Sequence, residues 1–148
     1  MKNGISPSLE DYLKAILFLK EENDIIRVTD LAKKLRVAKS SVNQAVTKLL
    51  ELKLITHERY GPLELTPLGR RQAQKIKERH QLLQCFFNEI LGVDRRIAEK
   101  DACNIEHYIS SDTLDKLVDF LASLTYSVPF QRKEGMLCQD KIINYSPN

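Results

Sequence analysis

The sequence predicts a mainly α-helical protein, in which an N-terminal winged helix-turn-helix domain with a small β-wing precedes an all-helical second half. Two short helical patterns meet at a tight turn over residues 37–39, and two short strands follow around Tyr60-Gly61-Pro62. Beyond the strands, apolar residues recur at helical spacing as far as Tyr126. The predicted divisions are residues 1–72 for the winged domain, 73–126 for the helical domain and 127–148 for an irregular tail.

The first half of the chain contains the start signals of three helices. Apolar residues keep a helical period over Leu9–Leu19, with Ser8 as the expected N-cap. Residues 25–28 suit a short strand, after which Thr29 is expected to cap the second helix and Ser40 the third.

The third helix carries apolar and polar side chains on opposite faces. Its expected buried positions are Val42, Ala45, Val46, Leu49 and Leu50. Its outer side chains include Lys39, Ser40, Ser41, Asn43, Gln44 and Lys48. Amides can bond to adenine edges, hydroxyls reach phosphates or bases, and ammonium groups attract phosphates. The helix is therefore predicted to enter the major groove of double-stranded DNA. The alternative is that the second and third helices form a plain helical hairpin with a solvated polar face.

The segment LITHERYGPLELT favours the DNA-binding interpretation, because a hairpin directly after a helix-turn-helix makes a winged helix. Arg59, near the tip, is predicted to contact a phosphate or the minor groove. Residues 1–75 carry 14 Lys or Arg against 9 Asp or Glu, whereas the remainder carries 9 against 11. This excess suits a polyanionic partner, although a basic run is also typical of a solvated face.

The second half reads as further helices. Thr66 and Pro67 open a long one that is expected to stop at Gly92, and Asp94 and Asp112 start two more. The last has an apolar face made of Leu114, Leu117, Val118, Leu121 and Leu124. An all-helical half this small needs a partner to bury its apolar faces, which predicts a homodimer and a palindromic operator.

Length and composition predict the cellular location of the protein and the state of its cysteines. The longest apolar run falls short of the about 20 residues of a membrane helix, and MKNGISPSLE has no apolar signal-peptide core, so a cytoplasmic protein without a membrane partner is expected. Cys85, Cys103 and Cys138 are odd in number and irregularly spaced, which predicts reduced thiols. Cys85 is interpreted as a small core side chain, and Cys138 as uninvolved.

One motif, DACNIEHYIS, gathers chemically active side chains. Cys103, Glu106 and His107 stand at i, i+3 and i+4, so in a helix that continues to Ile109 they share one face. Their sulfur, oxygen and nitrogen donors can collect a divalent transition metal. The alternative is chance: a buried thiol, a solvated carboxylate and a hydrogen-bonded imidazole side by side.

The order of elements and these residues together resemble the diphtheria-toxin-repressor family of iron- and manganese-dependent transcriptional regulators. The resemblance covers about residues 6 to 125, through SLEDYLKAI, the helix-turn-helix, ERHQLLQCFF and CNIEHYIS. It implies a homodimeric repressor of metal-uptake genes that a divalent metal activates, in the two-domain form without an SH3-like domain. The implied metal ligands are Asp11, Cys103, Glu106 and His107, with His80 in the same or an ancillary site and Glu99 as a further ancillary donor.

The resemblance is mixed in its metal ligands. Asp11 resembles the manganese branch, whereas Cys103 resembles the iron branch. Lys14 stands where manganese regulators have a second acidic ligand, so a binuclear manganese site is not expected, and Lys14 is expected to pair with a carboxylate instead. Gln84 replaces a carboxylate of the iron branch. Fe(II) is therefore the favoured cofactor, with Mn(II) next.

Three other classes of protein compete with this interpretation. A metal-independent winged-helix regulator would use its second domain only to dimerise. A hydrolytic metalloenzyme is disfavoured, because the sequence has no H-E-x-x-H motif, nucleophile elbow or phosphate loop, so no catalytic residue and no small-molecule substrate are expected. A metal-storage module would leave the helix-turn-helix and the wing unexplained.

Overall fold

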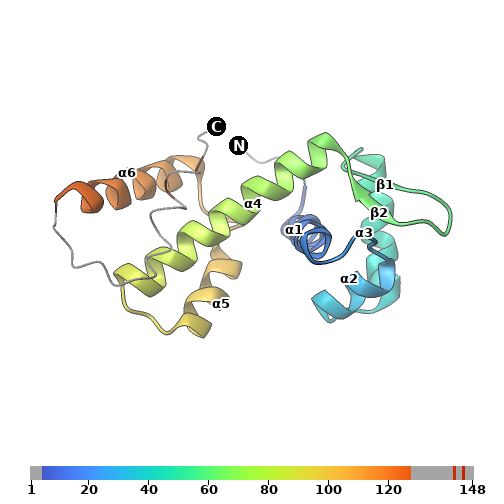
Figure 1. Cartoon of the computed structure of the whole chain (residues 1–148), viewed down its shortest axis with the longest axis horizontal. Coiled ribbons are helices and arrows are strands. Elements are labelled where there is room, and N and C mark those ends of the chain that lie inside the picture. Colours follow the sequence, from blue (N-terminus) through green and yellow to red (C-terminus); the bar gives the residue numbers. More distant parts are fainter. Residues whose placement is uncertain (1–4, 128–141, 143–144, 146–148) are drawn as a thin grey trace. The chain divides into compact units, whose positions relative to one another are not determined.

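The computed structural model describes residues 5–127, Ile142 and Tyr145, and the chain divides into two compact units, residues 2–76 and 77–148. In chain order the elements are α1 (Pro7–Glu22), α2 (Val28–Leu35), α3 (Lys39–Glu51), β1 (Ile55–His57), β2 (Leu63–Leu65), α4 (Pro67–Cys85), a π-helical turn (Phe86–Ile90), α5 (Arg95–Ile105) and α6 (Ser111–Ser127) (Figure 1). Helix α4 begins in the first unit and continues into the second. The predicted mainly helical fold with a winged helix-turn-helix is confirmed.

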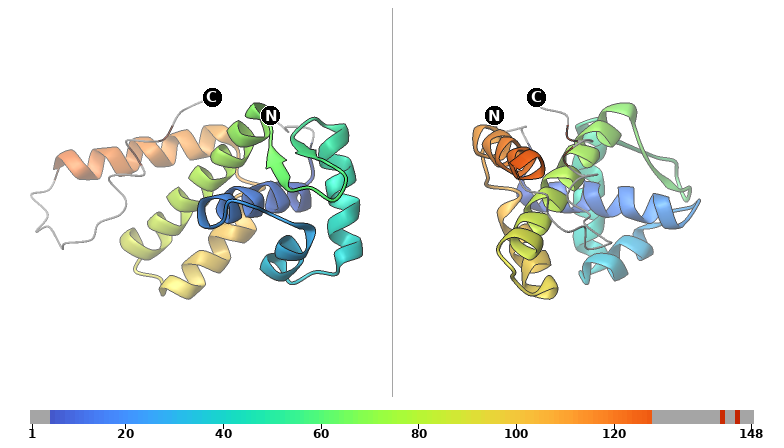
Figure 2. Two further views of the ribbon diagram at one scale, coloured as in Figure 1. Left: turned by 45° about the vertical axis from the view of Figure 1, so that its right-hand side comes forward. Right: turned by 60° about the vertical axis from the view of Figure 1, so that its left-hand side comes forward.

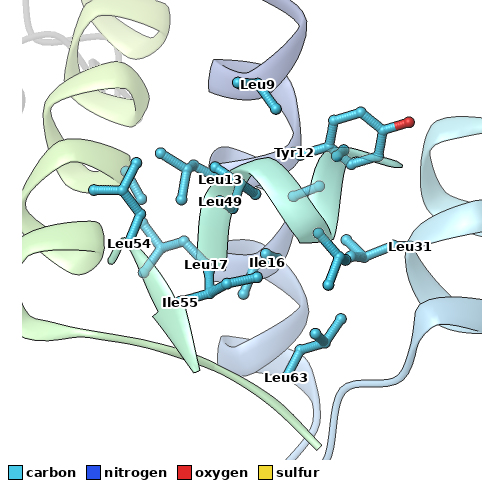
Figure 3. Packing of buried hydrophobic residues seen from close by; sticks show 14 of the residues in the cluster. Leu9, Tyr12, Leu13, Ile16, Leu17, Leu31, Leu49, Leu54, Ile55 and Leu63 are labelled. Carbon is cyan, nitrogen blue, oxygen red and sulfur yellow. The ribbon is translucent and has the colours of Figure 1, made fainter. Parts of the chain in front are cut away.

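The core of the N-terminal unit is formed by apolar side chains from α1, α2, α3, β1 and β2. Figure 3 shows Leu13 and Ile16 of α1 among Leu31, Leu49, Ile55 and Leu63, which come from α2, α3, β1 and β2. All six are at most 2% exposed. Burying one such side chain contributes about 1.5–3 kcal/mol, so this cluster fixes α2 and α3 on α1 and holds β1 and β2 in place.

Helix α1 starts earlier than the sequence indicated. The N-cap is Ser6 and not Ser8, because the Ser6 side chain accepts a hydrogen bond from the N–H of Leu9 at 3.3 Å. Pro7 then occupies the first helical position, where its fixed φ suits the helix and its missing N–H costs nothing.

The predicted strand at residues 25–28 is wrong, since the described chain has no strand there and α2 begins at Val28. Only Ile26 of these four residues is buried, at 1% exposed, and its carbonyl accepts one hydrogen bond, from the N–H of Leu63 at 2.8 Å. A single bond of this kind does not make a ladder.

The starts of α2 and α3 also differ from the prediction. Helix α2 is capped at Arg27 and not at Thr29, and the Arg27 N–H donates to the Asp30 carboxylate at 2.8 Å. Helix α3 follows Ala38, so Ser40 lies within the first turn instead of capping it. The Ser40 side chain is thereby left exposed on the outside of α3.

The predicted wing is present. Strands β1 and β2 pair antiparallel in the register Ile55↔Leu65, Thr56↔Glu64 and His57↔Leu63. Figure 2 shows this hairpin beside α3, and β1 packs on that helix. The wing is therefore held by the same core that holds the helix-turn-helix.

Helix α4 begins where Thr66 and Pro67 predicted, and its first turn is anchored to the end of α3 and the start of β1. The Thr66 hydroxyl accepts from the N–H of Gly69 at 3.0 Å and donates to the carbonyl oxygens of Lys53 and Leu54 at 2.8 and 3.1 Å. A Cβ at Gly69 would lie 1.8 Å from the Leu54 carbonyl oxygen. Only glycine fits this close approach.

The C-terminal unit has a smaller core of its own. Leu82 of α4 and Leu114 and Leu121 of α6 are buried, and Ile142 and Tyr145 pack against them. The apolar face of α6 is therefore covered in part by the chain itself, and not by a partner alone as the sequence analysis expected. Most of the predicted tail lies outside the described residues.

Tyr145 is held in place by a polar contact as well. Its hydroxyl donates to Asp115 Oδ1 at 2.7 Å. Burial, followed by the hydrogen bond from Tyr145 to Asp115 and the charge of that carboxylate, raises the pKa of the phenol above its ordinary value of 10.0.

Two further predictions concern the cysteines and the membrane. Cys85 is buried in the core, as expected. It is disulfide-bonded, so the predicted reduced thiol is wrong for this residue, because pairing depends on folding and cannot be read from spacing. Cys138 lies outside the described residues. None of the helices in the described part of the chain is long and apolar enough to span a bilayer.

Candidate metal centre and nucleic-acid interface

Three side chains with potential metal-ligating atoms come together within the C-terminal unit. His80 lies on α4, Cys103 lies on α5, and Glu106 is the C-cap residue of α5. One donor atom of each, a ring nitrogen, Sγ and a carboxylate oxygen, lies within 4.8 Å of the other two. His80 and Glu106 are buried, and Cys103 is half-buried and outside any disulfide. Nitrogen, sulfur and oxygen donors therefore converge on one small volume.

The end of α5 places Glu106 and His107 differently from the prediction. A helix running to Ile109 is wrong, because α5 ends at Ile105, Glu106 is the C-cap, and the N–H groups of Tyr108 and Ile109 both donate to the Ile105 carbonyl. Cys103 is thus the helical member of the motif, and His107 lies in the turn that follows.

Glu106 is the centre of this arrangement. It is 0% exposed, its Oε2 lies 2.8 Å from Nδ1 of His80, and its Oε1 lies 3.4 Å from Nε2 of His107. Its backbone carbonyl accepts from Nη1 of Arg79 at 3.5 Å. A buried carboxylate without partners is costly, so the two imidazoles both satisfy Glu106 and fix its orientation.

The donor set fits a divalent transition metal. Bonds to such ions are about 2.0–2.3 Å long, so donors around one ion lie up to roughly 4.6 Å apart, close to the spread found here. A thiolate and an imidazole favour the later first-row metals, and the carboxylate is acceptable to all of them.

Asp11 and Glu99 are the two remaining predicted ligands. Asp11 is on α1 of the N-terminal unit, with a half-exposed side chain whose Oδ1 lies 4.0 Å from Nζ of Lys14. Lys14 therefore pairs with a carboxylate, as the sequence analysis expected. Glu99 is exposed on α5, one turn before Cys103. Among the described residues, it does not lie in a cluster of three or more potential metal ligands. The metal-binding roles of Asp11 and Glu99 stay predictions.

The predicted reading face of α3 is open to solvent. Its exposed residues include Lys39, Ser40, Ser41, Asn43, Gln44 and Lys48, and Val42, Ala45, Val46 and Leu49 are buried on the opposite side. Of the predicted buried positions, Leu50 is the exception, at 37% exposed. The outer face of α3 thus presents amides, hydroxyls and ammonium groups together, which is the chemistry that base edges and phosphates require.

The tip of the wing holds a residue that the sequence analysis did not single out. Arg59 is exposed, as expected, and its guanidinium carbon lies 5.7 Å from the centroid of the Tyr60 ring. Tyr60 is 94% exposed and has a φ of +64°. The available signal was an aromatic residue in a turn position where glycine or asparagine is usual.

Two family models match the chain. The model described as the iron dependent repressor N-terminal DNA binding domain matches residues 4–63, and the model described as the iron dependent repressor metal binding and dimerisation domain matches residues 66–131.

Individual proteins match over most of the chain. An uncharacterised HTH-type transcriptional regulator of Methanocaldococcus jannaschii is 39% identical over 118 residues, which are 79% of this chain and 94% of that protein. The HTH-type transcriptional regulator MntR of Shouchella clausii is 41% identical over 116 residues, covering 78% and 80%. A solved manganese-dependent transcriptional repressor in complex with manganese superposes with a TM-score of 0.71 at 30% identity, over 77% of this chain and 52% of that one.

Proposed function

This chain belongs to the iron-dependent repressor family, and we propose that it represses metal-uptake genes as a cytoplasmic homodimer whose affinity for a palindromic operator depends on a divalent metal. The observation that carries the proposal is the buried Glu106, which shares one small volume with His80 and Cys103 in a protein that also presents the polar face of α3. No enzymatic role is part of the proposal.

We assign the metal to His80, Cys103, Glu106 and His107, with Asp11 as the donor from the DNA-binding unit and Glu99 as an ancillary donor. A bound ion would supply a positive charge to these donors. The two imidazoles contact the buried Glu106 carboxylate. Glu106 is thereby oriented before metal binds, which reduces the entropy that binding must remove.

Fe(II) is the proposed metal, with Mn(II) next. The thiol of Cys103 supports Fe(II), because thiolates favour softer ions than carboxylates do. Relatives named MntR and the manganese-bound repressor support Mn(II) as the second choice. Zinc or cobalt is expected to bind at least as tightly in vitro, since affinity rises along the first-row series, so availability in the cell would decide the physiological metal.

The metal dependence of DNA binding is expected to be moderate. Allosteric couplings usually amount to about 1–3 kcal/mol, which changes affinity roughly 5- to 150-fold. Linkage then requires operator DNA to tighten metal binding by the same factor.

The test is activation of DNA binding by each metal in turn, buffered to cellular free concentrations under anaerobic conditions. Fragments selected from a random DNA library in the presence of Mn(II) would serve as the operator. We expect Fe(II) and Mn(II) to raise the affinity of the wild-type chain for these fragments. Equal affinity with and without metal would leave the metal-independent winged-helix regulator as the better description.

The reading face of α3 makes a separate prediction. Replacing Gln44 by Ala is expected to relax base preference at one operator position by about 1–3 kcal/mol, because an amide can bond to an adenine edge. Replacing Lys39 or Lys48 by Met should instead weaken binding to all sequences and reduce the salt dependence by about one unit of slope, because ammonium groups contact phosphates. Affinity measured over a panel of operator variants and salt concentrations distinguishes the two effects. Identical, sequence-independent losses in all variants would show that α3 does not read bases.

A further inference from the structure

We propose that Tyr60, at the tip of the wing, is a DNA-contacting residue, with its ring against the sugar-phosphate backbone and its hydroxyl donating to a phosphate oxygen. This inference rests on the proposed DNA binding and extends it to a residue outside the reading helix.

The backbone of Tyr60 is in an unfavourable conformation for its residue type. The wing turn is closed by a hydrogen bond from the N–H of Gly61 to the carbonyl of Glu58 at 2.8 Å, which makes Arg59 and Tyr60 the central residues of a β-turn. Tyr60 has a φ of +64°, in the left-handed region that glycine and asparagine occupy readily and a bulky side chain does not.

Two other residues with positive φ have a local reason for it, and Tyr60 does not share that reason. Arg36 has a φ of +56° as the C-cap of α2, and Lys53 has a φ of +56° just past the end of α3, where its N–H donates to the Leu50 carbonyl. A left-handed residue is the usual way to end a helix. Tyr60 ends no helix.

Burial does not compensate for this strain. Tyr60 is 94% exposed, more than any other exposed large hydrophobic residue in the described part of the chain. The ring contact that the structure shows is with the neighbouring Arg59, whose guanidinium carbon is 5.7 Å from the ring centroid. A strained backbone that presents an exposed ring points to a contact outside the molecule.

The chemistry at the tip identifies that contact. Arg59 brings a guanidinium group beside a phenol, and both groups donate to phosphate oxygens, while the ring offers an apolar face to deoxyribose. The same hairpin is anchored to α3, which carries the reading face, so the tip belongs to the DNA-binding unit. A phosphate contact at this point would set the position of the wing without reading sequence.

Asparagine provides the decisive substitution, because it tolerates the left-handed conformation and removes the ring. Tyr60→Asn should leave the thermal unfolding midpoint unchanged or raise it, since the backbone strain is relieved. The same variant should bind DNA roughly tenfold more weakly, about the loss expected for one hydrogen bond to a charged group. Opposite signs for stability and affinity are not expected of a residue with only a structural role.

The experiment uses the full chain with Mn(II) and a mixed-sequence DNA duplex of three helical turns, titrated at several salt concentrations. Tyr60→Phe is expected to fall between the wild type and Tyr60→Asn, because it keeps the ring and loses the hydroxyl. Thr56→Ala, an exposed change on β1 away from the tip, is the matched control and should bind like the wild type.

Three results would overturn the inference. Tyr60→Asn could bind the duplex as tightly as the wild type, it could lose affinity together with unfolding temperature, or it could reduce self-association in sedimentation and leave DNA affinity intact. If the wild type itself does not bind the duplex, the proposed function fails first, so the two failures are distinguishable.

Discussion

Replacing Glu106 by Gln is expected to abolish metal-stimulated DNA binding. The substitution keeps the shape of the side chain and removes its charge. Loss of a residue that only hydrogen-bonds to a metal ligand lowers metal affinity roughly 10- to 100-fold, so loss of the ligand Glu106 should lower the affinity for Mn(II) by more than that. Glu106 is 0% exposed and contacts both imidazoles, so nothing in bulk solvent can replace its carboxylate.

Competition with a chromophoric chelator measures this affinity independently of DNA. Asp101→Asn is the matched control, because Asp101 is an exposed carboxylate on the same helix and is not a proposed metal donor. It should keep most of the affinity. If Glu106→Gln binds Mn(II) like the wild type while remaining folded, the assigned centre is wrong.

Replacing Gly69 by Ala is expected to destabilise the N-terminal unit by about 3 kcal/mol or more, at the upper end of the range for overpacking. The new Cβ would lie 1.8 Å from the Leu54 carbonyl oxygen, 2.8 Å from its carbonyl carbon and 3.2 Å from its Cα. All three atoms belong to the backbone, so rotation of a side chain cannot relieve the clash. The first turn of α4 or the start of the wing would have to move.

Thermal unfolding of the full chain provides the measurement, with an expected decrease of roughly 10 °C or more for the unit that contains Gly69. Gly92→Ala is the matched control. Its Cβ would meet nothing within 4 Å, so only its φ of +71° opposes the change, at a cost of about 1 kcal/mol. An equal or larger loss at Gly92 would contradict the steric account of Gly69.

Much of the fold could be predicted because its signals are local. Thr66 with Pro67 and Asp94 were correctly identified as helix starts, since each caps its helix through contacts within a few residues. Ser6 and Ser8 show the limit. Both are capping residues two positions apart, and the prediction of Ser8 was wrong, although Pro7 between them indicated Ser6.

Features of the fold that depend on contacts between residues distant in sequence could not be predicted from hydrophobic periodicity. The apolar residues at positions 25–28 were mistaken for a strand, because a loop with one buried side chain, Ile26, looks like a short strand in sequence. The packing of Ile142 and Tyr145 on the C-terminal core lies in a segment without any period. The bonded state of Cys85 likewise depends on a partner that only folding brings near.

In the candidate metal centre, too, the residues close in sequence could be predicted and the distant one could not be predicted from spacing. The spacing of Cys103 and Glu106 placed two donors together from the sequence alone. His80 is 26 residues away from Glu106, and only the family resemblance associated it with the motif. The end of α5 at Ile105 was not visible, because nothing in CNIEHYIS is a strong helix stop.

The π-helical turn at Phe86–Ile90, which follows α4, changes which side chains share a face of the helix. Such a turn accommodates one additional residue without breaking the helix. One residue corresponds to about 100° of rotation at about 3.6 residues per turn. Side chains beyond Phe86 are therefore out of phase with those before it, and steps of three and four counted from His80 do not reach the same side of the helix. An alignment through this segment needs room for a one-residue gap.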